Sequence, residues 1–144
     1  MASATISKVV DVPADAIWKL ISNFGDTSWM PAGTQATLVG SGVGMERRIA
    51  VGPDKLIHER LEALDAANRT LQYAIPVNVP FPVTDYHATM RVRARGTGCE
   101  LEWSARYECA AAAEAEVGKA VQGMYGMMID WIAARAKATA GDVP

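Results

Sequence analysis

The spacing of hydrophobic and polar residues changes along the chain, and each spacing predicts a different type of element. Residues 5–12 alternate loosely and are rich in β-branched side chains, which predicts a strand. From residue 34 to 109 the period is two, and Gly, Pro, Asn and Asp separate the alternating segments. Six strands with short connections, typical of an antiparallel meander, are predicted at 35–39, 44–51, 55–64, 70–75, 84–95 and 99–108.

Helical spacing occurs before and after these strands. Pro13 suits the first turn of a helix, and the apolar residues within 17–21 form one stripe behind it. A second short helix is predicted at 26–30, ended by Pro31. Residues 111–138 are predicted to form one long helix, because apolar residues recur there at spacings of three and four.

Three glycines are out of place in the predicted long helix. Gly118, Gly123 and Gly126 each cost up to ~1 kcal/mol relative to alanine in a helix interior. Close approach of another backbone, or room left for a ligand, would explain why they are kept.

These elements predict an α+β fold in which the antiparallel sheet curls around the long helix. The long helix is the apolar element large enough to fill such a curve, and a pocket is expected where sheet and helix do not fully meet. No repeat or low-complexity linker divides the sequence, so we expect one domain over residues 1–144.

Composition excludes several classes of protein. Of 144 residues, 50% are hydrophobic, and the formal net charge is −2, which argues against disorder and against nucleic-acid binding. No run approaches the ~20 apolar residues of a membrane span. The sequence begins without the basic start and apolar run of an export signal, so we expect a cytoplasmic protein.

The two cysteines are expected to be structural. Cys99 and Cys109 flank a predicted strand, whose length would hold them roughly 30 Å apart, too far for a disulfide. With His58 and His87 they form no spaced set of metal ligands, and no glycine-rich phosphate loop is present. We therefore expect neither a metal nor another cofactor.

Short motifs follow one another along nearly the whole chain. They are Val12 to Ile21, Trp29-Met-Pro, Gly42 to Arg47, Glu59-Arg-Leu with Asp65, Leu71-Gln-Tyr73, Val83 to Arg91 and Leu101-Glu-Trp103. In this order and spacing the chain resembles the SRPBCC superfamily, which includes START lipid-transfer domains and birch-pollen-allergen-type proteins, and more narrowly the bacterial polyketide cyclase/dehydrase group. The resemblance implies a helix-grip fold, about seven strands around a C-terminal helix, with a deep cavity for a lipid, polyketide or other small hydrophobic molecule.

Alternation also predicts which side chains face the interior, independently of the resemblance. Most of these residues would serve equally as plain core, but a buried tyrosine hydroxyl needs a polar partner. The residues predicted to contact a ligand are Trp29, Met30, Tyr73, Ile75, Phe81, Tyr86, Ala88, Met90, Trp103, Tyr107, Met124, Tyr125 and Met128.

Arg47 and Glu59 are charges on otherwise apolar strand faces, and they are the candidate catalytic residues. An odd-length turn after Val51 would place them opposite each other, whereas a two-residue turn would pair Arg48 with Glu59. A buried Arg–Glu pair could hold or polarise a ligand oxygen, or it could be purely structural. Both histidines are expected on the solvent face.

The segment 75–83 alternates proline with apolar residues, as expected of a stiff lid or ligand entrance near Trp29 and Met30. Packing against the helix or against a second copy of the chain is the alternative. Three functions remain open: binding a small hydrophobic ligand, a cyclase, aromatase or dehydratase reaction, and interaction with a protein partner.

Overall fold

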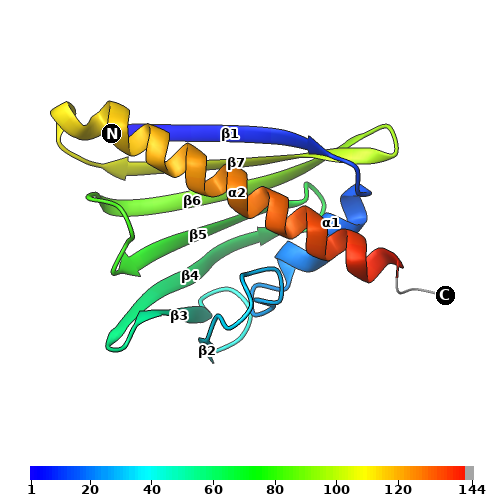
Figure 1. Cartoon of the computed structure of the whole chain (residues 1–144), viewed down its shortest axis with the longest axis horizontal. Helices are drawn as coiled ribbons and strands as arrows, with labels where there is room; N and C mark the ends of the chain where they lie inside the picture. Colours follow the sequence, from blue (N-terminus) through cyan, green and yellow to red (C-terminus); the bar gives the residue numbers. More distant parts are fainter. Residues whose placement is uncertain (142–144) are drawn as a thin grey trace.

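The computed structural model describes residues 1–141 and contains seven antiparallel strands in the order β1-β7-β6-β5-β4-β3-β2 (Figure 1). Each strand after β1 pairs with its neighbour in sequence, and β1 joins the sheet beside β7. The helix-grip fold predicted from the sequence is thereby confirmed. The elements are β1 (Ala2–Val10), α1 (Ala14–Ser22), β2 (Ala36–Val39), β3 (Glu46–Gly52), β4 (Lys55–Asp65), β5 (Thr70–Val77), β6 (Thr84–Arg95), β7 (Gly98–Glu108), the 3₁₀ turn η1 (Ala111–Ala113) and α2 (Glu114–Gly141).

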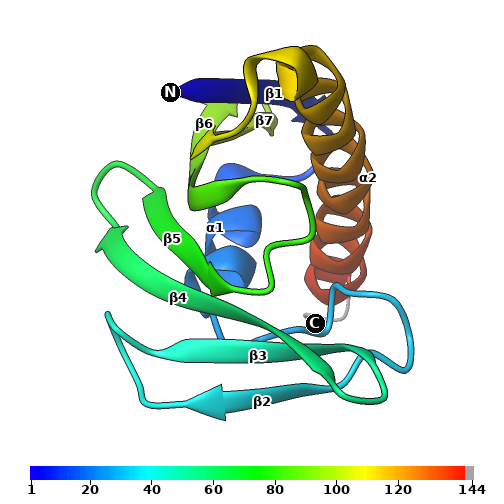
Figure 2. The same ribbon diagram turned by 90° about the vertical axis from the view of Figure 1, so that its left-hand side faces the viewer.

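The long helix α2 crosses the concave side of the curved sheet, and α1 lies inside the curve (Figure 2). The main contacts of α2 are with β1 and α1, so the helix lies over one side of the sheet rather than its centre. Its buried residues recur at intervals of three or four, which places them on one face. They are Val117, Val121, Tyr125, Ile129, Ile132 and Ala136.

One of the three glycines in α2 has a packing explanation. A Cβ at Gly126 would lie 3.2 Å from the Cδ1 atom of Ile6, so glycine lets α2 lie close to β1. The Lys8 ammonium of the same strand donates to the Gly126 carbonyl at 3.1 Å. Gly118 and Gly123 have no such neighbour within 4 Å, so neither close approach nor crowding accounts for them.

The prediction of a second short helix at residues 26–30 is wrong. This segment forms hydrogen-bonded turns instead, in which the Met30 amide donates to the Thr27 carbonyl at 3.0 Å and the Ser28 amide to Asp26 Oδ1 at 2.9 Å. Asp26 satisfies a backbone amide locally, and Pro31 cannot continue a helix. The turns carry Trp29 into the core, where 5% of its surface is exposed.

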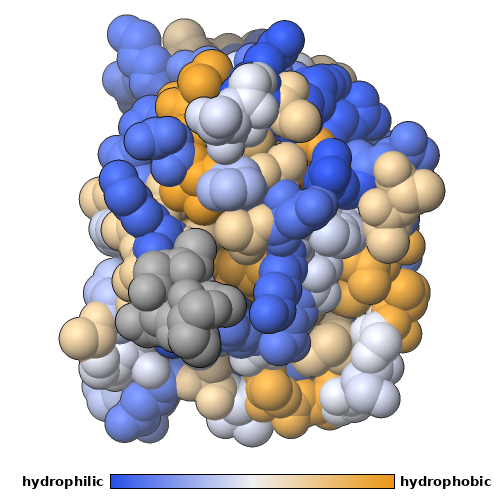
Figure 3. Space-filling model, turned by 90° about the vertical axis from the view of Figure 1, so that its right-hand side faces the viewer, coloured by the Kyte–Doolittle hydropathy of each residue, from blue (hydrophilic) through white to orange (hydrophobic). Residues whose placement is uncertain are grey.

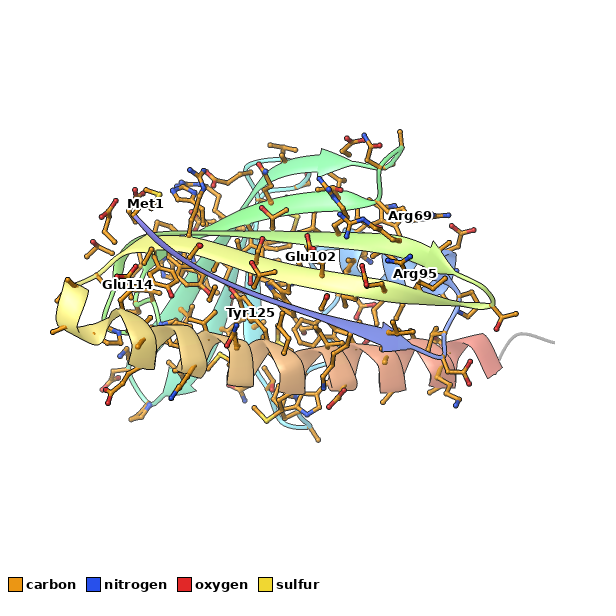
Figure 4. All side chains as sticks on the ribbon, turned by 90° about the horizontal axis from the view of Figure 1, so that it is seen from above. Met1, Arg69, Arg95, Glu102, Glu114 and Tyr125 are labelled. Atoms are coloured by element: carbon orange, nitrogen blue, oxygen red, sulfur yellow. The ribbon has the colours of Figure 1, made fainter. Side chains whose placement is uncertain are left out.

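Strand alternation separates an apolar inner face from a charged outer face. On β7, Leu101, Trp103 and Tyr107 are all buried with exposed fractions of 0%. Figure 4 shows Tyr125 between α2 and the sheet, with Glu102 on the side of the sheet away from the helix. The inward and outward sets match those that the period of two predicts.

The two ends of the molecule differ in what they carry. One end holds α1 and the end of α2, and its surface mixes hydrophilic and apolar side chains (Figure 3). The other end holds the connection between β5 and β6 and the start of α2.

Within residues 1–141, no helix combines the length and the apolar character needed to cross a membrane. Cys99 and Cys109 are free thiols, as expected.

Candidate functional site

Arg47 and Glu59 face each other inside the sheet. The β3–β4 turn has two residues between Gly52 and Lys55, which alone would pair Arg48 with Glu59. A bulge at Val51 adds one residue to β3 and moves Arg47 opposite Glu59. Arg47 Nε donates to Glu59 Oε1 at 2.5 Å, and the two residues are 3% and 6% exposed.

Aromatic rings and one carbonyl enclose the Arg47 guanidinium. Its Nη1 donates to the carbonyl of Phe24, the residue just beyond α1, at 3.1 Å. Its carbon lies 3.9 Å from the centre of the Phe24 ring, and the rings of Trp29 and Tyr73 lie 5.9 and 5.7 Å away. Cation–π attraction and the ion pair both stabilise the charge in this buried position.

A cluster of aromatic side chains continues from Arg47 toward α2. The Trp103 ring stacks on Tyr125 of α2, with centroids 4.3 Å apart and planes 14° apart. Trp103 Nε1 donates to the Tyr73 hydroxyl at 3.2 Å, so the buried indole N–H is satisfied. The Trp29 ring meets Trp103 edge to face at 6.4 Å, which joins the 26–30 turns to the sheet.

All four tyrosines of the chain are buried, with exposed fractions of 2% or less. The hydroxyls of Tyr86 and Tyr125 are hydrogen-bonded to each other. Burial raises the pKa of both, and it raises the pKa of Tyr73 well above its usual value, with the Glu59 charge adding to the shift. The phenols therefore stay protonated and uncharged at neutral pH, where they can donate hydrogen bonds.

Tyr107 differs from the other three tyrosines. Its ring stacks on Tyr86, with centroids 5.9 Å apart and planes 9° apart. Among the buried side-chain nitrogen and oxygen atoms of the described residues, its hydroxyl oxygen is the one that has no hydrogen-bond partner. Burial raises its pKa, to which Cys109 and Glu114 contribute.

The loop at residues 78–83, named the 78–83 loop below, connects β5 to β6 (Figure 2). It ends at Thr84, which pairs with Glu108, the residue after Tyr107. Val79, Phe81 and Val83 are half-buried or buried, whereas the prolines between them are exposed. The Phe81 ring stacks on Tyr86 with centroids 5.9 Å apart. The loop thus places an aromatic side chain of its own against the buried aromatic cluster.

Two open hollows flank the 78–83 loop. The first has a volume of about 620 Å³ and lies between the loop, Lys55 and the residues Glu108 to Ala110. The second has a volume of about 310 Å³ and lies where β5 and β6 separate, because their pairing ends at Ala74 and His87. Tyr86 and Ile75 line its inner part, so this hollow reaches the aromatic cluster.

His87 lies at the outer part of the second hollow, as expected for a solvent-facing residue. Its Nδ1 is 2.7 Å from Glu62 and its Nε2 is 2.9 Å from Asp85. The sequence showed no partner for this histidine, because Glu62 lies on another strand; Asp85 is two residues before His87, within the bulge of β6. His58 lies 3.5 Å from Glu46 on the same face of the sheet.

The remaining predicted contact residues lie at different depths. Ala88 and Met90 are buried on the inner face of β6, and Ile75 is buried near the end of β5. Met30 and Met128 are half-buried and pack against the core, and Met124 is half-buried at the side of α2. Their role in ligand binding stays a prediction.

The family model for polyketide cyclase/dehydrase and lipid transport matches residues 1–137. The chain belongs to this family. The match covers both the sheet and α2, and it agrees with the resemblance seen in the motifs. No curated protein matches the sequence.

Solved structures show the same fold as this family member. A protein from Thermobifida fusca is 29% identical with a TM-score of 0.82, and the match covers 94% of this chain and 93% of that one. Norcoclaurine synthase from Thalictrum flavum, solved with dopamine and hydroxybenzaldehyde, is 19% identical with a TM-score of 0.75, covering 94% and 86%. Ara h 8.0201 is 19% identical with a TM-score of 0.73, covering 94% and 97%.

The family membership supports a ligand-binding fold. Stacked side chains from both layers, such as Trp103 and Tyr125, occupy the region between β7 and α2. The deep cavity stays a prediction. The described residues include no group of three or more His, Cys, Asp or Glu side chains placed to hold a metal ion.

Proposed function

We propose that this chain binds a small hydrophobic ligand of lipid, polyketide or aromatic type between the sheet and α2, and that the 78–83 loop moves to admit it. The single observation that carries the proposal is the position of Phe81. Its ring lines the 620 Å³ hollow and at the same time stacks on the buried Tyr86. A ligand ring that replaced Phe81 would find an aromatic surface already formed.

The energetics are sufficient without catalytic groups. Burying a side chain of the size of phenylalanine contributes roughly 1.5–3 kcal/mol, so a ligand with a few such groups reaches micromolar affinity, which is about 8 kcal/mol. The norcoclaurine synthase structure holds dopamine and hydroxybenzaldehyde, so small aromatic molecules fit at least one protein of this fold. The family description, which includes lipid transport, points the same way.

The test uses 2-ethylnaphthalene as the probe and the tryptophan fluorescence of the protein as the signal. Saturable quenching with a micromolar Kd is expected for the wild type. In Phe81→Ala the ligand no longer competes with the Phe81 ring, so we expect binding about fivefold tighter, equivalent to about 1 kcal/mol for a half-buried phenyl group.

Leu64→Ala is the matched control, because Leu64 is an apolar side chain, 44% exposed, at the end of β4. Its Kd should equal that of the wild type. Absence of saturable binding in the wild type would contradict the proposal. So would a change in affinity that is the same in Phe81→Ala and Leu64→Ala.

A cyclase, aromatase or dehydratase reaction is the second candidate, and the burial of the Glu59 carboxylate favours it. The charge of Glu59 raises the pKa of both Tyr73 and Tyr86, so it acts within the same interior as the phenols. In this role Glu59 would move a proton and Arg47 would hold a ligand oxygen. Turnover lost in Glu59→Gln with ligand affinity retained would support the reaction, and unchanged turnover would exclude it.

A further inference from the structure

Some of the buried phenol protons have no acceptor. Tyr86 and Tyr125 each carry one O–H proton, and two hydroxyls bonded to each other leave one of the two protons without an acceptor. The hydroxyl of Tyr107 has no partner within residues 1–141 and adds a second spare proton. At least two phenol protons therefore point to acceptors that the described residues do not supply.

Tyr86 and Tyr107 lie at the end of the interior next to the 78–83 loop. Tyr107 stacks on Tyr86, and Tyr86 stacks on Phe81 of the loop. Tyr107 directly precedes Glu108 and Cys109, which line the same hollow as Phe81. A ligand that takes the place of Phe81 would lie against the Tyr86 ring, on which Tyr107 is stacked.

An unpartnered buried hydroxyl is unfavourable, since it loses its hydrogen bonds to water and gains none in return. A ligand that brings an acceptor oxygen recovers this loss. Phenols kept neutral by burial donate to carbonyl, enol or phenolate oxygens, and they offer nothing comparable to a pure hydrocarbon.

We propose that this interior selects planar aromatic ligands carrying an acceptor oxygen of carbonyl type, which receives the hydrogen bond of Tyr107 and the spare proton of the Tyr86–Tyr125 pair. This inference rests on the proposed ligand-binding function and names the ligand class. Tyr107 is the main specificity-determining residue. Because the hydroxyls are buried, the interior would discriminate between ligands by their hydrogen-bond acceptors rather than by their size.

The experiment compares two probes of nearly equal size, 2-acetylnaphthalene and 2-ethylnaphthalene, which differ in one carbonyl oxygen. The wild type should bind the ketone roughly threefold to tenfold more tightly, which is the net value of one or two neutral hydrogen bonds. Tyr107→Phe should lower the ratio of the two Kd values by about threefold, the value of one neutral hydrogen bond, with little change in the Kd of 2-ethylnaphthalene.

Thr89→Val is the matched control, because it removes a hydroxyl from the outer face of the same sheet. It should keep the wild-type ratio. The infrared carbonyl band of bound 2-acetylnaphthalene gives a second measurement. It should lie at a lower wavenumber in the wild type than in Tyr107→Phe, which a merely structural role of Tyr107 would not produce.

Equal affinity for the two probes in the wild type would overturn this inference while leaving the proposed function intact. A ratio unchanged in both Tyr107→Phe and Tyr86→Phe would overturn it as well. Binding of neither probe would contradict the proposed function, and the inference would fall with it.

Discussion

Buried polar groups have hydrogen-bond partners at one end of the interior and lack one at the other. At the α1 end, the charge of Arg47 is balanced by Glu59, bonded to the Phe24 carbonyl and covered by aromatic rings. At the other end, Tyr107 has an unpartnered hydroxyl below the 78–83 loop. Both regions are buried, so burial alone does not separate them.

The difference indicates where stability and where recognition are located. A fully satisfied buried network specifies one arrangement of its neighbours, and here it fixes the turns after α1 to β3 and β4. An unsatisfied hydroxyl does not stabilise the free protein, and it forms a favourable hydrogen bond only when a ligand supplies a partner. We therefore assign the α1 end to the fold and the loop end to the ligand.

Alkali tests the whole set of buried phenols and should have the largest effect. Burial raises the pKa of Tyr73, Tyr86 and Tyr125 in the folded state, so their contribution to stability is complete below pH 10, the unfolded value, and is lost as the pH rises above it. At pH 11 the three phenols together should reduce the free energy of unfolding by about 4 kcal/mol, at about 1.4 kcal/mol each.

Urea unfolding at pH 8 and pH 11 measures this loss, and absorbance at 295 nm follows the ionisation. Tyr107, whose pKa is raised less strongly than that of Tyr73, should be the first phenol to ionise, and Tyr107→Phe should remove this first step. Ionisation of all four tyrosines near pH 10 in the folded protein would contradict the comparison.

Arg47→Met should be the most damaging single substitution at the α1 end. It leaves the Glu59 carboxylate buried without its partner, which should cost about 3 kcal/mol in the free energy of unfolding. Arg95→Met is the control, because Arg95 is exposed and its pair with Glu100 at 3.4 Å should contribute less than about 1 kcal/mol. Equal losses in the two variants, measured by urea unfolding, would mean that the Arg47–Glu59 pair contributes no more than a surface pair.

Much of the fold could be predicted from the sequence, because alternation with one buried face determines both the strands and their inner residues. Tyr73, Tyr86 and Trp103 lie inside as the period of two predicts. The helix predicted at 26–30 failed because Asp26 and Pro31 favour local turns, which periodicity over five residues does not distinguish.

The site was harder to predict, because its chemistry depends on register and on long-range partners. The opposition of Arg47 and Glu59 follows from a bulge at Val51 that no residue type announces. A partner was expected for every buried tyrosine, and within residues 1–141 Tyr107 is the exception. Such an exception is visible only in three dimensions.

Tyr73→Phe tests how much one hydrogen-bonded tyrosine hydroxyl contributes to stability. It removes the acceptor of the Trp103 N–H, whose distance to the Tyr73 hydroxyl is 3.2 Å, and leaves that donor buried without a partner. The free energy of unfolding should fall by about 2 kcal/mol. A loss below about 0.5 kcal/mol in urea unfolding would show that the indole finds another acceptor.

Tyr107→Phe is the matched substitution at the loop end and should have the smallest effect. The same atom is removed from a tyrosine that is equally buried, but no hydrogen bond is lost within residues 1–141. The free energy of unfolding should therefore change by less than about 0.5 kcal/mol, or rise slightly because an unsatisfied polar group has left the interior. A loss as large as that of Tyr73→Phe would mean that the Tyr107 hydroxyl is hydrogen-bonded in the free protein, to water or after a rearrangement. The hydroxyl would then not be free to donate a hydrogen bond to a ligand.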